Sequence, residues 1–151
     1  MKDRVQELAS VLRRQAAPFL AAHPTLQHRW LDQGAIMTLQ FPPTGDSGFE
    51  VALQVGNGYA YVLAGHSHHA FHPPSDSPDS EIARALDLVR DLLSPRMRLS
   101  EVSSGGRPYR WVVERQLNGQ WRPHTEDSSV FFNYFGRRSE RVFQNTQLQP
   151  Q

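Results

Sequence analysis

Hydrophobic and polar residues alternate most regularly in the stretch 49–64, on both sides of the dipeptide Asn57-Gly58. An alternation with a period of two residues is typical of a β-strand with one buried face. Asn-Gly is the pair that a two-residue type I′ turn prefers, because both positions need a positive φ. The stretch therefore predicts a β-hairpin in which Val55 faces Ala60. A three-residue loop that includes Gly56 is the alternative, and it would shift the register.

The two-residue turn gives this hairpin one apolar face and one mixed face. The apolar face, which we expect to be buried, carries Phe49, Val51, Leu53, Val55, Ala60, Val62 and Ala64. The mixed face, which we expect to be half exposed, carries Glu50, Ala52, Gln54, Tyr59, Tyr61 and Leu63. A shift of the register by one residue would bury the two tyrosines instead. The type of turn therefore decides which side of the sheet presents them.

A cluster of histidines follows the second strand of the hairpin. By the same alternation, we expect His66 and His68 to point to the core side and His69 to point away. The strand must end by His72, because Pro73-Pro74 cannot continue a hydrogen-bonded ladder. Imidazoles bind transition metals, and two ligands two residues apart on a strand lie on one side. His66, His68 and His72 are therefore candidate ligands of a divalent transition metal.

Two other stretches have apolar residues at three- and four-residue spacing, which predicts amphipathic helices. The first runs from Lys2 to about Ala17 and is interrupted by Pro18, beyond which the apolar stripe continues for one more turn. The second covers residues 78–93, with Ser77 as its N-cap and a proline at the first helical position. We expect both helices to pack on the sheet, and a free partner-binding helix is the alternative for the first.

The remaining strands are predicted from shorter patterns. They cover residues 26–31, 35–41, 96–103, 109–114, 120–122, 130–135 and 140–145. Asn118-Gly119 repeats the hairpin signal, and we expect Pro123 to end the strand that follows. The result is an α+β domain of two layers, an antiparallel sheet of about six to eight strands with both helices packed on it. We expect one domain over residues 1–148 and a frayed end at 149–151.

Composition and charge restrict the class of protein more than its function. A chain of 151 residues with 38% hydrophobic and 21% charged residues is typical of a globular domain. The absence of cysteine excludes disulfides and thiolate chemistry and fits the cytosol. No apolar run is long enough to span a membrane. Acidic residues predominate in 42–91 and arginines predominate from Leu92 onward. This asymmetry indicates either an anionic partner or neutralisation of one half by the other.

Motifs of catalysis are missing from the sequence. There is no P-loop, no G-x-S-x-G elbow and no H-E-x-x-H pair. Arginines interleaved with aromatic residues in the last third are residue types of a single-stranded nucleic-acid surface. The net charge of +1 and the core-like spacing of the aromatic residues favour solvated arginines between core strands instead. Nucleic-acid binding is therefore only the third hypothesis.

The leading hypothesis is a small non-enzymatic protein-binding domain of the cytoplasm. The order helix–strands–helix–strands resembles the folds of secretion chaperones and toxin-immunity proteins in architecture, which implies a chaperone-, immunity- or adaptor-like role. The residues expected to bind another protein are Tyr59, Tyr61, Arg137, Arg138 and Arg141. A homodimer formed through an edge strand or the first helix is also considered. The second hypothesis is a metal-binding protein or metal-dependent enzyme that uses the histidines.

Overall fold

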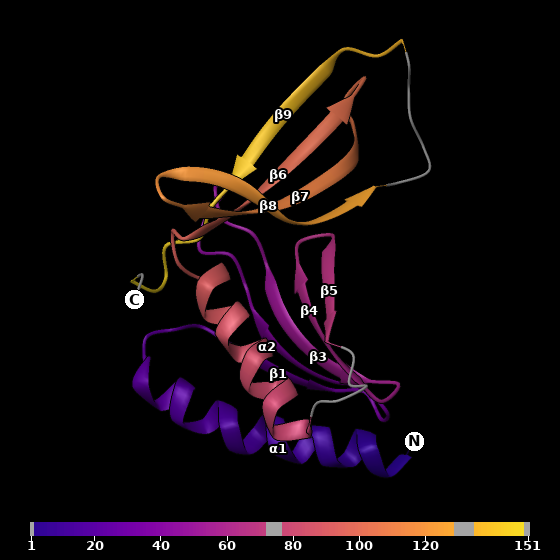
Figure 1. The fold of residues 1–151 in the computed structure, drawn as a ribbon, viewed down its shortest axis with the longest axis vertical. Coiled ribbons are helices and arrows are strands. Elements are labelled where there is room, and N and C mark those ends of the chain that lie inside the picture. Colours follow the sequence, from indigo (N-terminus) through magenta and orange to yellow (C-terminus); the bar gives the residue numbers. More distant parts are fainter. Residues whose placement is uncertain (1, 72–76, 129–134, 150–151) are drawn as a thin grey trace.

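A computed structural model describes residues 2–71, 77–128 and 135–149, with side chains except those of Lys2 and 68–71. Within these ranges the chain forms two helices and nine strands, and all strand pairs are antiparallel. The α+β class with antiparallel strands is thus confirmed. The strands divide between two sheets, which lie one above the other in Figure 1, where the alternation pattern had led us to expect one sheet.

Each sheet is built from strands that are close in the sequence. The helices are α1 (Lys2–Ala22) and α2 (Pro78–Leu92). Sheet 1 contains, in spatial order, β1 (Arg29–Asp32), β2 (Met37–Phe41), β3 (Val51–Gly56), β4 (Tyr59–Ala64) and β5 (Ser67–Phe71). Sheet 2 contains, in spatial order, β8 (Gln120–Ser128), β7 (Arg107–Leu117), β6 (Met97–Ser104) and β9 (Arg138–Phe143).

The hairpin of β3 and β4 has the predicted turn and register. Asn57 and Gly58 have φ values of 53° and 81°, as a type I′ turn requires. Val55 pairs with Ala60, and both are completely buried. The three-residue alternative is therefore wrong, and the tyrosines of β4 lie on the face opposite the core.

Both helices cover the same face of sheet 1 (Figure 1). The apolar stripe of α2 is buried as predicted, and Ser77 accepts a hydrogen bond from the backbone N–H of Ser80 at the helix start. Helix α1 continues through Pro18 to Ala22 without the predicted interruption, and Pro18 lies on its exposed side. Neither of these two helices, in the parts of the chain that are described, is long and apolar enough to cross a membrane.

Two polar side chains lie at the centre of the packing. Glu81 of α2 is fully buried and accepts hydrogen bonds from Arg4 of α1 at 2.5 Å and from the backbone N–H of Ala60 at 3.0 Å. Arg4 also donates to the carbonyl of Gly58 at 3.0 Å. This network ties both helices to the tip of the β3–β4 hairpin. Asn145, after β9, is also buried, and its side chain forms hydrogen bonds with both the N–H and the carbonyl of Phe49, before β3.

The prediction that β4 continues toward the histidines is wrong. The strand ends at Ala64, and the chain turns at Gly65 and His66, where Gly65 has a φ of 58°. Strand β5 then returns along β4, with Ser67 paired to Ala64. His66 is an exposed turn residue, so it does not point to the core side. The alternation that placed the histidines does not extend across a turn, and His72 lies outside the described residues.

Strand β8 extends well beyond Pro123, where we had expected it to end. The ladder with β7 contains Pro123 opposite Glu114 and Thr125 opposite Val113, so His124 is the extra residue of a β-bulge. Strand β8 has a neighbour on one side only in the described sheet. An edge strand accepts a proline because the missing N–H need not enter a second ladder.

The predicted strand 130–135 lies outside the described residues except for Phe135. That side chain is fully exposed beside a turn. Strand β9 begins two residues earlier than the predicted 140–145 and pairs with β6, where Arg141 lies opposite Glu101. The chain then returns to the core, because Leu148 is buried and its N–H donates to the carbonyl of Leu93.

Gly65 allows a stability test of this junction between the sheets. A Cβ atom there would lie 2.8 Å from Leu99 Cδ2 of β6. Gly119 also has a positive φ, but a Cβ atom there would meet no other atom within 4 Å. We expect Gly119→Ala to lower the free energy of unfolding by about 1 kcal/mol, and Gly65→Ala by about 2 kcal/mol, because only the second adds a steric clash. Urea denaturation of both variants measures the difference, and equal losses would contradict the close approach.

Candidate functional site

The face of sheet 1 that the helices leave uncovered presents a line of large side chains from β4. Tyr59, Tyr61 and Leu63 are half-buried, and they alternate with buried residues that face the helices. The rings of Tyr59 and Tyr61 are 6.2 Å apart and meet edge to face at 73°. Such a pair is held in one arrangement by its own contact. We call these three side chains the tyrosine face.

Beside the tyrosine face, the neighbouring strands β2 and β3 contribute small buried side chains and hydrogen-bonded polar side chains. Ala52 of β3 and Thr38 of β2 are buried on this side although no helix covers them. Gln54 donates to the Thr38 hydroxyl at 3.3 Å, and Arg29 at the outer strand donates to Gln40. The surface is therefore a platform of aromatic, aliphatic and amide groups.

The predicted arginines do not belong to this platform. Arg138 and Arg141 lie on β9 of sheet 2, opposite Ser104 and Glu101, and Arg137 immediately precedes that strand. The guanidinium of Arg141 lies 4.6 Å from the ring centre of Phe143 and donates to the carbonyl of Asp46.

The two tyrosines lie at the end of sheet 1 that is remote from sheet 2. Strand β4 starts with Tyr59 at the tip held by Arg4, whereas its other end adjoins the contact of Ser67 with Asp127 of β8 at 2.7 Å. The aromatic and the arginine parts of the predicted surface are thus on different sheets.

Of the three predicted metal ligands, the structure describes the side chain of His66 and the backbone of His68. The exposed ring of His66 lies against Trp111 of β7, with ring centres 5.3 Å apart, and the Trp111 indole donates to Glu101 at 3.0 Å. Strand β5 carries His68 opposite Leu63 in the backbone register. Among the residues that the structure describes, no group of three or more histidine, aspartate or glutamate side chains is arranged to hold a metal ion.

Two of the arginines considered for nucleic-acid binding, Arg110 and Arg115, are in ion pairs. Arg110 pairs with Glu126 at 2.6 Å, and this contact raises the pKa of the guanidinium. Arg115 pairs with Asp91 of α2 at 2.7 Å, which joins the acidic and the basic parts of the chain. Charges engaged in this way are less available to phosphates, so the geometry gives nucleic-acid binding little support.

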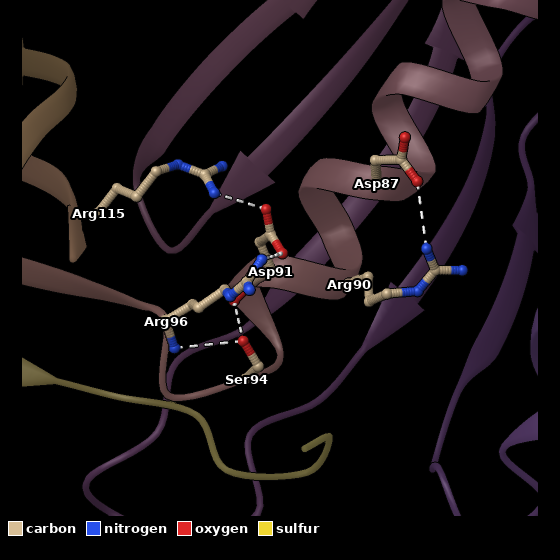
Figure 2. Close-up of polar contacts among 6 residues, drawn as sticks. All are labelled: Asp87, Arg90, Asp91, Ser94, Arg96 and Arg115. Atoms are coloured by element: carbon tan, nitrogen blue, oxygen red, sulfur yellow. Dashed lines mark hydrogen bonds and ion pairs between the residues drawn. The ribbon is translucent and has the colours of Figure 1, made fainter. Parts of the chain in front are cut away.

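The sequence patterns did not reveal a second surface, which lies along the outside of α2. There, two hollows meet beside the polar residues drawn in Figure 2: Asp87, Arg90, Asp91, Ser94, Arg96 and Arg115. The sequence does show Asp87 and Arg90 three residues apart on the predicted helix, a spacing that indicates an ion pair. Nothing local connects Arg115, on β7, with Asp91.

Comparisons of the chain with protein-family models, with curated proteins and with solved structures found no match. We therefore infer a function from these surfaces alone.

Proposed function

We propose that the protein is a small non-enzymatic binding module that holds another protein on the tyrosine face of sheet 1. The observation that carries the proposal is the line of half-buried side chains Tyr59, Tyr61 and Leu63 on a platform that no helix covers in the described part of the chain. Tyrosine is enriched among the residues that dominate binding energy, because it offers a large apolar ring and a polar hydroxyl.

The platform is suited to binding because little has to be ordered when a partner arrives. The two rings already contact each other, and the side chains of Gln54 and Thr38 are already hydrogen-bonded. A side chain that is held before binding loses less conformational entropy in the complex. Because the arginines of β9 lie on the other sheet, the proposal rests on the tyrosine face alone. The absence of cysteine is consistent with action in the cytoplasm.

We expect Tyr61→Ala to weaken capture of the partner by at least about tenfold, the effect of removing one central aromatic contact. The measurement is capture of proteins from a lysate of the cells that make this protein, with titration of the enriched partner. Tyr109→Ala, on sheet 2, is the matched control, because it removes the same side chain from a different surface. Arg138→Glu tests the β9 arginines separately.

A photo-reactive phenylalanine analogue at position 61 locates the contact directly. We expect it to cross-link the captured partner, whereas the analogue at position 109 should not. If Tyr61→Ala and Tyr109→Ala capture the partner equally well, and position 61 gives no cross-link, the tyrosine face is not the binding surface. Loss of capture in Arg138→Glu alone would move the binding surface to sheet 2.

A further inference from the structure

A trough of about 450 Å³ runs between the last turns of α1 and the middle of α2. Its floor is formed by Phe19 and Leu86, which are almost completely buried. Its walls include Pro18, Ala22 and Ala83, which are exposed. Small side chains above large ones let another backbone approach closely while its own apolar side chains reach the floor.

One end of the trough is charged. The guanidinium of Arg90 lies 5.5 Å from the ring centre of Phe19 and donates to Asp87 at 3.2 Å. The side chains of Arg90 and Asp87 are 33% and 71% exposed. An exposed pair of this type, three residues apart on a helix, contributes only about 0.3–0.5 kcal/mol. A carboxylate from another molecule can therefore replace Asp87 on Arg90 at small cost.

A second hollow of about 270 Å³ continues past Arg90, so that Asp87 and Arg90 line both hollows. Figure 2 shows Arg96 and Arg115 approaching the same carboxylate of Asp91 from two sides, at 3.7 and 2.7 Å. Arg90 on α2, Arg96 after the helix and Arg115 on β7 thus bring three guanidinium groups to the two carboxylates of Asp87 and Asp91. The balance is positive and favours an anionic group.

We propose that this groove binds an amphipathic helix of a partner protein. Apolar side chains at positions i and i+4 of that helix lie over Phe19 and Leu86, and an acidic side chain about one turn further on lies at Arg90. Leu86 and Arg90 lie about one helical turn apart on α2, which matches the spacing between the apolar pair and the acidic side chain. The groove lies between two helices and offers no strand edge, so a third helix fits it better than an extended peptide. This site is separate from the tyrosine face.

The test is selection from a display library of amphipathic helical peptides of about 16 residues, in which the polar positions are varied, on the intact protein. We expect the enriched peptides to carry Asp or Glu one turn after their apolar pair. Binding of an enriched peptide, measured by fluorescence anisotropy, should weaken by about tenfold in Arg90→Glu and when the acidic residue of the peptide is changed to lysine. The lysine peptide should regain affinity for Arg90→Glu.

Three variants make the result specific. Ala83→Glu places a carboxylate in the trough and should abolish binding. Arg84→Glu makes the same change of charge as Arg90→Glu, at the position next to Ala83. Arg84 does not line the trough, so this variant should change the affinity less than twofold (about 0.4 kcal/mol). Tyr61→Ala should have no effect.

Three outcomes would overturn the groove assignment: no enrichment, equal losses in Arg84→Glu and Arg90→Glu, or unchanged binding in Ala83→Glu. Peptides that lose binding in Tyr61→Ala and keep it in Ala83→Glu would support the tyrosine face and also overturn the groove.

Discussion

Replacing Asn145 with alanine is expected to lower the free energy of unfolding by about 4 kcal/mol, because three buried backbone groups lose their partner together. The Asn145 side chain accepts from the N–H of Phe49 at 3.0 Å and donates to the carbonyls of Phe49 and Leu92 at 3.0 and 3.1 Å. Asn145 is only 1% exposed, so water reaches these groups only if the C-terminal segment opens. Urea denaturation followed by tryptophan fluorescence measures the loss.

Gln144 is the matched control for Asn145. It is the preceding residue, it is half-buried, and its side chain donates to the carbonyl of Pro95 at 2.7 Å. Gln144→Ala should therefore cost about 1 kcal/mol, the value of one such hydrogen bond. Hydrogen exchange of the Phe49 amide should accelerate in Asn145→Ala and not in Gln144→Ala. Similar losses of stability in the two variants would mean that Asn145 is not the clamp that the geometry indicates.

Replacing Glu81 with alanine is expected to cost about 3 kcal/mol, because it removes the carboxylate that pairs with the charge of Arg4 and leaves the buried N–H of Ala60 without an acceptor. The Glu81 side chain is 0% exposed, whereas Arg4 is 29% exposed and can turn partly to water. The expected loss is therefore at the lower end of the range of about 3–5 kcal/mol for breaking a buried ion pair. Glu81→Gln keeps an acceptor for Ala60 but removes the charge, so we expect about half of the loss.

The same two helices provide a control for Glu81. Arg14 of α1 pairs with Asp79 of α2, and both side chains are 62% exposed. Arg14→Ala should change the free energy of unfolding by less than about 0.5 kcal/mol, because water solvates the charges of an exposed pair. The measurement is the shift of the urea midpoint at constant slope. A cost for Arg14→Ala as large as that for Glu81→Ala would show that burial is not what makes the inner pair important.

The parts of the fold that sequence patterns predicted are those with a local cause. Asn57-Gly58 specifies its turn through the φ values that it tolerates, and Ser77 with Pro78 specifies the start of α2 through capping. Alternation then assigned the tyrosines to the correct face of β4. Gly65 gives a weaker signal, because a lone glycine inside an alternating pattern does not by itself indicate a reversal.

The division of the strands into two sheets could not be predicted, because alternation shows which residues share a face but not which strands pair. The roles of Glu81 and Asn145 were missed for a related reason. At the first turn of a helix, Glu81 has the pattern of an exposed carboxylate that interacts with the helix dipole. Its partner Arg4 is 77 residues away. The groove beside Arg90 likewise depends on how α1 crosses α2, and no local pattern encodes that crossing.

Strand β8 has a further consequence for how molecules of this protein meet in a crowded cell. The bulge at His124 shifts the register halfway along the strand, and Pro123 has no backbone N–H to donate. A strand from a neighbouring molecule would meet an interrupted ladder there, which disfavours fibrillar stacking along that edge.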